Sequence, residues 1–202
     1  MNGALYDLIN GFAERRILRP LRYELLSGLG SRIVEIGAGT GANFPCYSGD
    51  VHVLALEPDP SMARRARAKI EAASVQIELR IADDRLLDTL PPNSVDAVVF
   101  TLVLCTVTDP LATLGRARRV LKANGMLVLL EHVRSGGTVG RFQDCIAPLW
   151  RCVAGGCHLN RDTSAAIAAA GFDVGAIRSK TLTRLSPIQE LIYGTAQPMP
   201  AG

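Results

Sequence analysis

Short apolar runs alternate with amphipathic segments along the first two-thirds of the chain. Apolar positions at helical spacing predict helices over residues 60–73 and 109–122. Strands that alternate with helices at this spacing are typical of βαβ units and a parallel sheet. Strands are predicted at residues 33–36, 51–57, 75–81, 95–100 and 126–130, and the first two are expected to be buried.

The last third of the chain departs from this alternation. Residues 139–153 are predicted to be helical, and Asn160 or Asp162 could cap a short alanine-rich helix after them. Residues 173–180 and 191–197 look like strands with no helix of useful length between them, so we expect an antiparallel hairpin. The predicted fold is α/β: a Rossmann-like, doubly wound, seven-stranded and mostly parallel sheet that ends in this hairpin, with helices on both faces.

The N-terminal residues 1–30 are predicted to form a helical lid or cap on a main domain of residues 31–202. Two helical pieces are expected in residues 4–28, and Pro20 would begin the second. Arginines at positions 15, 16, 19 and 22 lie between the apolar stripes, and we interpret them as a solvated basic face. The alternative is a weak peripheral membrane contact, which needs apolar and basic faces together.

Composition narrows the function classes. Of the 202 residues, 48% are hydrophobic and 20% charged, which is ordinary for a globular protein. The net charge of +3 is too balanced to indicate a nucleic-acid partner, and no apolar run approaches the roughly 20 residues that span a bilayer. Five cysteines, an odd number, favour reduced thiols over a disulfide framework. A cytoplasmic location is the expectation.

The first predicted strand runs into a glycine-rich turn, GAGTGA at residues 37–42. Glycines permit positive φ and leave the backbone bare, so a nucleotide-type cofactor could approach it closely. The turn fits G-x-G-x-x-G/A, and Glu57 follows at the spacing expected for an acid that accepts hydrogen bonds from a ribose. The alternative is a tight strand-to-helix turn without a ligand.

Acidic residues at three strand ends change this interpretation. Glu35 precedes the glycines. A negative charge at this position would not stabilise a bound pyrophosphate, but it would stabilise a cofactor that carries an ammonium or sulfonium group. Asp83, followed by Asp84, ends the third strand, where an adenine amino group could lie. Acids at the carboxyl ends of parallel strands line the crevice in which such sheets bind ligands. The pattern favours a cationic nucleoside, although each acid could instead serve a cap or turn, and Glu35 could pair with Arg32.

Four longer motifs carry a resemblance to a known family. They are VEIGAGTGANFPCY (34–47), SVDAVVFTLVLCTVTD (94–109), LEHVR (130–134) and GGCHLNRDT (155–163). With them the chain resembles the class I S-adenosylmethionine-dependent methyltransferases over nearly its whole length. Within that superfamily it is most similar to the small methyltransferase-like proteins that include alkyl thiol methyltransferases. Bacterial phospholipid and quinone methyltransferases share the first motif and parts of the others.

This resemblance implies a function. S-adenosylmethionine would be the cofactor and S-adenosylhomocysteine the product. The acceptor would be a small, lipophilic molecule, with a thiol as the best guess. A phospholipid, quinone or other O/N-methyltransferase is the alternative enzyme. A cofactor-binding domain without catalysis and a nicotinamide-dependent oxidoreductase are the alternatives from other classes.

The resemblance also implies roles for individual residues. Glu57 would hold both ribose hydroxyls, and Pro58 would lie against the adenine. Asp83 or Asp84 would accept a hydrogen bond from the adenine amino group, and Glu35 would anchor the methionine ammonium through ordered neighbours. The remaining predicted cofactor-binding residues belong to the glycine turn or follow the fourth strand: Gly37, Ala38, Gly39, Thr40, Gly41, Asn43, Thr101, Leu102 and Val103.

For catalysis, His132 and His158 are the predicted proton acceptors, because imidazole titrates near neutrality. Their alternative roles are orientation and helix capping. A thiol has a reference pKa of about 8.5 and needs only a modest shift to react as a thiolate. Cys145, Cys152 and Cys157 lie near His158, but their spacings match no strong zinc pattern, so we predict no metal.

Overall fold

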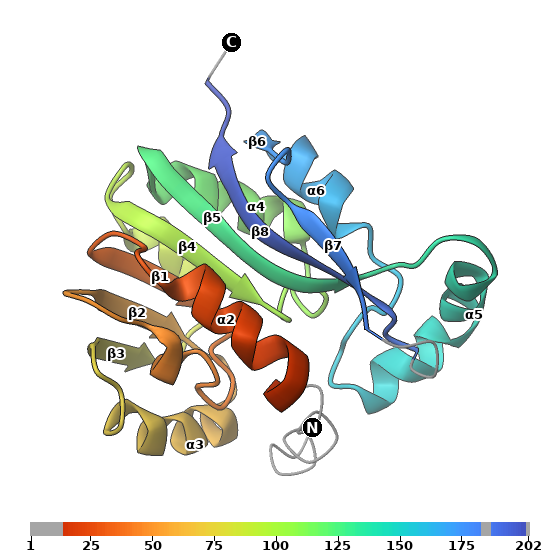
Figure 1. Ribbon diagram of the computed structural model, residues 1–202, viewed down its shortest axis with the longest axis horizontal. Coiled ribbons are helices and arrows are strands. Elements are labelled where there is room, and N and C mark those ends of the chain that lie inside the picture. The colour runs from red at the N-terminus through yellow and green to blue at the C-terminus, as the bar shows by residue number, and fades with distance from the viewer. Residues whose placement is uncertain (1–13, 183–186, 201–202) are drawn as a thin grey trace.

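The computed structural model describes residues 14–182 and 187–200. Within these residues the chain forms one eight-stranded sheet, parallel from β3 to β5 and antiparallel at β8 (Figure 1). The path through the sheet is β3 (Gln76–Arg80), β2 (His52–Leu56), β1 (Arg32–Ile36), β4 (Val95–Thr101), β5 (Leu121–Val133), β8 (Glu190–Pro198) and β6 (Phe172–Asp173), and β7 (Arg178–Thr181) also pairs with β8.

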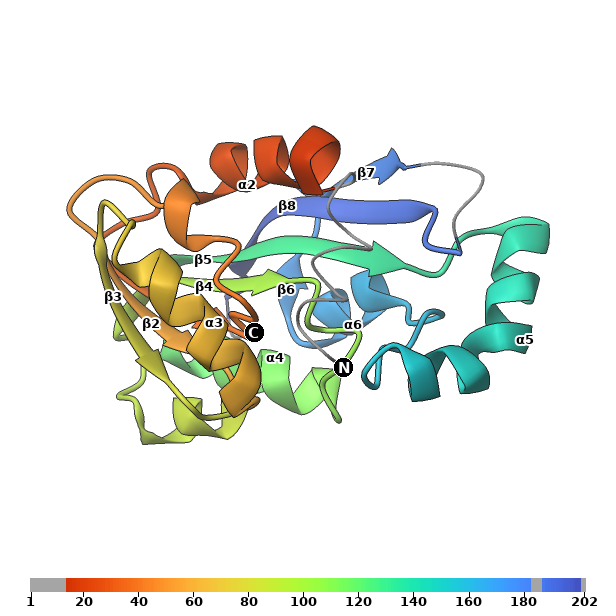
Figure 2. The same ribbon diagram turned by 90° about the horizontal axis from the view of Figure 1, so that it is seen from below.

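Helices cover both faces of the sheet. Figure 2 shows α2 above it and α4 and α6 below it. The helical elements are η1 (Glu14–Leu18), α2 (Arg19–Leu26), η2 (Phe44–Cys46), α3 (Pro60–Ile70), η3 (Asp84–Thr89), α4 (Pro110–Val120), α5 (Gly137–Val153) and α6 (Thr163–Ala169). The predicted Rossmann-like, doubly wound architecture is therefore confirmed.

Both faces of the central strands are apolar, as expected for a parallel sheet covered on two sides. In β4, Val98 and Phe100 join the core between the sheet and helices α4 and α6, while Val99 joins the core between the sheet and α2. Along β1, Val34 and Ile36 face the first core. Glu35 therefore lies in a buried strand, between apolar neighbours.

The end of the sheet differs from the prediction in one respect. The expected strand over residues 173–180 is interrupted by a turn, in which the backbone of Ile177 donates to the carbonyl of Val174 at 3.0 Å. The Asp173 carboxylate accepts from the backbone of Gly175 at 2.9 Å and supports that turn. The segment thus gives two short strands, β6 and β7, and eight strands instead of seven. The antiparallel hairpin of β7 and β8 is confirmed.

At the N-terminal end, α2 has a proline in its first turn, as expected of Pro20, and buries its apolar side chains against the sheet. Arg22 is only 4% exposed, and its guanidinium donates to the Glu14 carboxylate and the Asn43 amide oxygen. The predicted solvated basic face is therefore wrong for Arg22. Residues 4–13 of the expected helices lie outside the described residues, and a lid formed by residues 1–30 stays a prediction.

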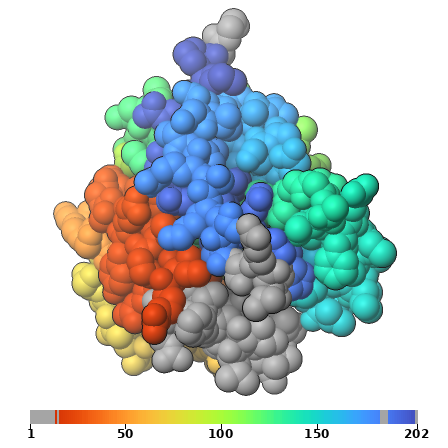
Figure 3. Space-filling view, turned by 45° about the vertical axis from the view of Figure 1, so that its right-hand side comes forward, coloured from red at the N-terminus to blue at the C-terminus, as the bar shows by residue number. Residues whose placement is uncertain are grey.

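Helix α5 follows the carboxyl end of β5 and projects beyond the sheet. On the face seen in Figure 3, the blue C-terminal segments lie between the N-terminal helix in red and α5 in teal. Phe142, Leu149 and Val153 are exposed on α5. Among the described residues, no helix is both long and apolar enough to cross a membrane.

Candidate active site

The glycine turn begins directly after β1. Gly37, Gly39 and Gly41 all have left-handed φ values, between +58° and +75°. A Cβ atom at Gly37 would lie 2.3 Å from Val103 Cγ2, and one at Gly41 would lie 2.7 Å from a Phe44 ring carbon. At Gly39 the nearest heavy atom would be a backbone oxygen at 4.0 Å. Two of the glycines are thus required by packing, whereas Gly39 presents bare backbone to open space.

Glu57 follows β2 and reaches the same turn. Its Oε2 accepts from the backbone N–H of Gly39 at 2.7 Å, and its Oε1 accepts from the backbone N–H of Asp59 at 2.9 Å. Burial raises the pKa of the Glu57 carboxyl above its usual value. Each carboxylate oxygen keeps a further acceptor site. The fold therefore fixes a hydrogen-bond acceptor beside the open backbone of Gly39.

Glu35 is the centre of a buried polar network. Its Oε1 accepts from Asn43 Nδ2 at 2.9 Å, and its Oε2 accepts from the Tyr47 hydroxyl at 2.8 Å. The Asn43 amide also donates to Thr101 Oγ1 at 3.0 Å, and the Arg22 guanidinium donates to the Asn43 oxygen. Burial raises the pKa of Glu35 to about 7. The network joins α2, β1 and β4 immediately behind the glycine turn.

The segment after β4 is held in an uncommon conformation. Leu102 has a φ of +56°, which costs free energy for a residue other than glycine. Its backbone N–H donates to the Leu130 carbonyl at 2.8 Å. The buried Glu131 Oε1 accepts from the backbone of Val103 at 2.8 Å and of Leu104 at 3.0 Å. The segment that packs on Gly37 is therefore fixed by the end of β5.

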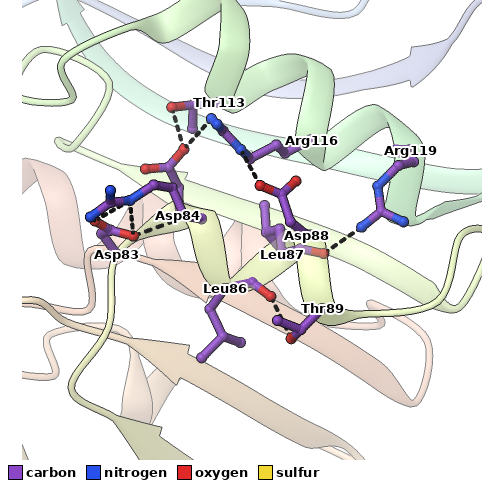
Figure 4. Close-up of polar contacts among 10 residues, drawn as sticks. Asp83, Asp84, Leu86, Leu87, Asp88, Thr89, Thr113, Arg116 and Arg119 are labelled. Carbon is purple, nitrogen blue, oxygen red and sulfur yellow. Dashed lines mark hydrogen bonds and ion pairs between the residues drawn. The ribbon is translucent and has the colours of Figure 1, made fainter.

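Asp83 and Asp84 have different surroundings (Figure 4). The Asp84 carboxylate pairs with Arg116 at 3.0 Å and accepts from the Thr113 hydroxyl at 2.8 Å, which ties η3 to α4. Asp83 caps η3 and forms a 2.7 Å ion pair with Arg85, and its side chain is 38% exposed. Asp83 is therefore the more accessible of the two acids beyond β3.

A second group of side chains lies past the segment after β4. Cys105, His132 and Cys157 are all buried, and their potential ligand atoms lie within 4.8 Å of one another. His132 Nε2 is 3.1 Å from Cys157 Sγ, and its Nδ1 has no hydrogen-bond partner among the described residues. The backbone N–H of His158 donates to the Cys105 carbonyl at 2.8 Å. The His132 imidazole therefore lies beside Cys157, and the backbone of His158 lies beside Cys105.

Charge and hydrogen bonding shift the pKa values in this group. Hydrogen bonds from Cys105 and His132 lower the pKa of the Cys157 thiol despite its burial, while the bond to Cys157 and burial raise the pKa of Cys105. Burial lowers the pKa of His132, but Cys157 outweighs this effect and the net shift is upward. Cys145 and Cys152, which the sequence places near Cys157, are exposed.

Comparison with known proteins identifies the family. Residues 34–129 match a family model described as a methyltransferase domain. A phosphatidylethanolamine N-methyltransferase of Cereibacter sphaeroides is 32% identical over 147 residues, which cover 71% of this chain and 71% of that protein. The chain belongs to the class I S-adenosylmethionine-dependent methyltransferases. The predicted family is thereby confirmed.

Thiol methyltransferases are also similar to this methyltransferase. The thiol S-methyltransferase TMT1B of Rattus norvegicus is 36% identical over 135 residues, which cover 65% of this chain and 55% of that protein. The human thiol S-methyltransferase TMT1A is 32% identical over 144 residues, or 69% of this chain and 59% of that protein. The chain thus spans a little over half the length of these curated relatives.

Solved structures agree with the fold. An S-adenosylmethionine-dependent methyltransferase of Methanosarcina mazei superimposes with a TM-score of 0.63 at 16% identity, covering 90% of this chain and 98% of that one. The [4+2]-cyclase SpnF gives a TM-score of 0.69 at 17% identity, covering 93% and 82%. Because one of these two is described as a cyclase, the likeness supports the fold and not the reaction.

The residues of this methyltransferase fit the cofactor predicted from its family. The open backbone at Gly39 leaves room for a sugar or methionine moiety, and the Glu57 carboxylate beside it suits vicinal hydroxyls. S-adenosylmethionine is thus confirmed as the predicted cofactor at the level of the family. The position of each cofactor atom stays a prediction.

Several partners in the site were not predicted from the sequence. Tyr47, Arg22 and Glu131 make hydrogen bonds that fix Glu35, Asn43 and the segment after β4. Two of them lie within the quoted motifs, Tyr47 in the first and Glu131 in LEHVR. A carboxylate directly after the predicted fifth strand was the available signal for Glu131. The alternative interpretation of Glu35, a pairing with Arg32, is wrong, because its carboxylate accepts from Asn43 and Tyr47.

We expect Gly39→Ala to weaken S-adenosylmethionine binding by about tenfold or more. The added methyl group would enter the space that we assign to the cofactor, and overfilling a packed contact costs about 1–3 kcal/mol. Gly28→Ala is the matched control, because Gly28 has a similar φ of +72° and also has open space at its Cβ position. Both variants should lose about 1–2 kcal/mol of stability from the left-handed backbone. Calorimetric titration of both variants with S-adenosylmethionine separates the loss of affinity from the shared loss of stability. Equal affinities in the two variants would place the cofactor away from Gly39.

Proposed function

We propose that this protein transfers a methyl group from S-adenosylmethionine to the sulfur of a small, lipophilic thiol. One observation carries the donor half of the proposal: the Glu57 carboxylate is hydrogen-bonded to Gly39 beside open backbone at the carboxyl ends of β1 and β2. Ligands of open α/β sheets bind at this end of the strands. The similarity to thiol S-methyltransferases supports the acceptor half.

Residues around the glycine turn would hold the cofactor. Glu57 would accept from the ribose hydroxyls, with Pro58 next to the adenine. Asp83 is preferred for the adenine amino group, because Asp84 is engaged with Arg116. Glu35 would favour the methionine ammonium through Asn43 and the adjacent Thr101–Val103 segment.

The remaining chemistry concerns the acceptor. When bound, S-adenosylmethionine supplies a methyl group on a positively charged sulfur. The protein then has to align the acceptor and exclude water, and a thiolate needs little further activation. His132 and His158 are the proposed sites of proton acceptance. The His132 imidazole lies beside Cys157, and the backbone of His158 is bonded to Cys105.

A second candidate acceptor is the amine of a lipid head group. The exposed Phe142, Leu149 and Val153 on α5 favour it, because apolar side chains on a projecting helix can contact a lipid surface. The similarity to the bacterial phosphatidylethanolamine N-methyltransferase agrees with this candidate. A cytoplasmic location with weak peripheral membrane contact is part of our proposal and fits both acceptors.

An acceptor panel tests the proposal. The full chain would be incubated with S-adenosylmethionine and thiols, phenols, amines or phosphatidylethanolamine vesicles, and S-adenosylhomocysteine would be quantified. We expect turnover with lipophilic thiols. Turnover with vesicles alone would select the lipid candidate, and cofactor binding without turnover on any acceptor would indicate a non-catalytic domain. Calorimetry with NADH is the control, since binding of NADH in place of S-adenosylmethionine would overturn the proposal.

A further inference from the structure

Cys105, His132 and Cys157 come from three segments that the sequence separates widely. They follow β4, end β5 and follow α5, respectively. All three side chains are buried, and their two sulfur atoms and one ring nitrogen lie within 4.8 Å of one another. We propose that these residues bind one Zn²⁺ ion through Cys105 Sγ, Cys157 Sγ and His132 Nε2.

The backbone around the three residues is held in place independently of any ion. Glu131 fixes the segment before Cys105 through the backbone of Val103 and Leu104. The Arg161 guanidinium donates to the carbonyls of Leu104 and Val107 on either side of Cys105. The His158 N–H bond to the Cys105 carbonyl joins the two cysteine segments directly. A site with ordered ligands before binding loses little conformational freedom when the ion enters.

The ligand types match the chemistry of zinc. Zinc binds cysteine sulfur at about 2.3 Å and histidine nitrogen at about 2.0–2.1 Å, almost always in tetrahedral geometry. That geometry separates neighbouring ligand atoms by roughly 3.5–3.8 Å. The observed Nε2–Sγ distance of 3.1 Å and the upper bound of 4.8 Å for the group bracket this range. Small side-chain rotations would therefore complete the coordination.

Charge balance also favours a divalent ion. A coordinating thiol loses its proton, so two cysteinates and a neutral imidazole around Zn²⁺ form a neutral group. A neutral group is compatible with burial, whereas an unpaired charge is not. The described residues offer two cysteines and one histidine in this cluster and no fourth ligand. Three protein ligands are typical of zinc sites that keep a position for water or another small ligand.

None of the three ligands is required to hold S-adenosylmethionine, so the site does not rest on the proposed donor. A zinc ion on His132 Nε2 would occupy the lone pair of that imidazole, and His158 would then be the proton acceptor of the two. The proposed zinc site differs from the zinc grouping considered from the sequence, in which Cys157 was placed with Cys145, Cys152 and His158. Cys145 and Cys152 are exposed and lie outside the cluster. These two cysteines therefore provide matched controls.

Metal binding by the full-length, reduced chain tests the proposal. After removal of metal with a chelator, Co²⁺ should bind with a stoichiometry of one and give the thiolate-to-cobalt absorption of a tetrahedral site, and Zn²⁺ should abolish this absorption. Cys105→Ser and Cys157→Ser should each weaken Co²⁺ binding by at least roughly 100-fold, because even residues that only orient metal ligands contribute 10- to 100-fold. Cys145→Ser and Cys152→Ser should bind as the unaltered chain does.

A second measurement keeps the proposal testable if the serine variants misfold. X-ray absorption of the zinc-loaded, unaltered chain should give two sulfur ligands and at least one imidazole nitrogen. Absence of stoichiometric Co²⁺ binding would overturn the proposal. So would equal losses in the exposed-cysteine variants, a coordination sphere without sulfur, or a Cys105–Cys157 disulfide found by mass spectrometry of the reduced preparation. None of these readouts depends on methyl transfer.

Discussion

Glu57→Ala is expected to weaken S-adenosylmethionine binding by about tenfold or more. Hydrogen bonds to a charged group contribute about 1.5–3 kcal/mol each, and the variant loses the carboxylate that we assign to the ribose hydroxyls. It also loses the acceptors for the backbone of Gly39 and Asp59, which relaxes the turn. Isothermal titration calorimetry with S-adenosylmethionine measures the change directly.

Glu78→Ala is the control for this prediction. Glu78 is an acid on the neighbouring strand β3, but its side chain is 43% exposed and pairs with Arg80. The control should bind the cofactor as the unaltered chain does. If Glu57→Ala also retains full affinity while remaining folded, the ribose must lie elsewhere.

The contribution of Glu35 to the free energy of unfolding is expected to fall as the pH rises from about 4.5 to about 7. Burial raises the pKa of Glu35 to about 7 in the folded chain, against an ordinary value of 4.5. Between these values the folded state holds more protons than the unfolded state, so stability decreases with increasing pH. A shift of this size corresponds to a loss of about 3 kcal/mol above pH 7. Urea denaturation at several pH values measures it.

Glu35→Gln separates this contribution from the rest of the chain. The glutamine keeps the shape of the side chain but cannot ionise, so the pH dependence should become shallower by about 3 kcal/mol over the same interval. Glu78→Gln, at an exposed acid, should leave the profile as it is. An unchanged profile in Glu35→Gln would mean that the Arg22 and Asn43 network keeps Glu35 ionised throughout.

The sequence predicted the parallel half of the sheet well because β1, β2, β4 and β5 contain largely apolar runs that are buried on both faces. The edge strand β3 is only partly buried. The prediction was less accurate where a few specific contacts determine the local structure. The turn supported by Asp173 divides one expected strand into β6 and β7. The buried position of Arg22 depends on Glu14 and Asn43, which only the folded chain brings together.

The same distinction holds for the site. The glycine turn, Glu35 and Glu57 could be predicted because the signal is local: a strand, a bare turn and an acid at a known spacing. The grouping of Cys105, His132 and Cys157 has no such signal. It depends on the carboxyl ends of β4 and β5 and on the return of the chain after α5. Local sequence patterns therefore predict the residues that we propose for the methyl donor more readily than the group of Cys105, His132 and Cys157.

The interior position of β8 has a consequence for the order of folding. Residues 190–198 pair with β5 on one side and with β6 and β7 on the other. During synthesis, the five parallel strands from residues 32–133 could associate early, but β5 would expose an unpaired edge until β8 emerged from the ribosome. An open edge strand is a site of intermolecular pairing. Nascent chains that pause before residue 190 should therefore be the ones that aggregate or recruit chaperones.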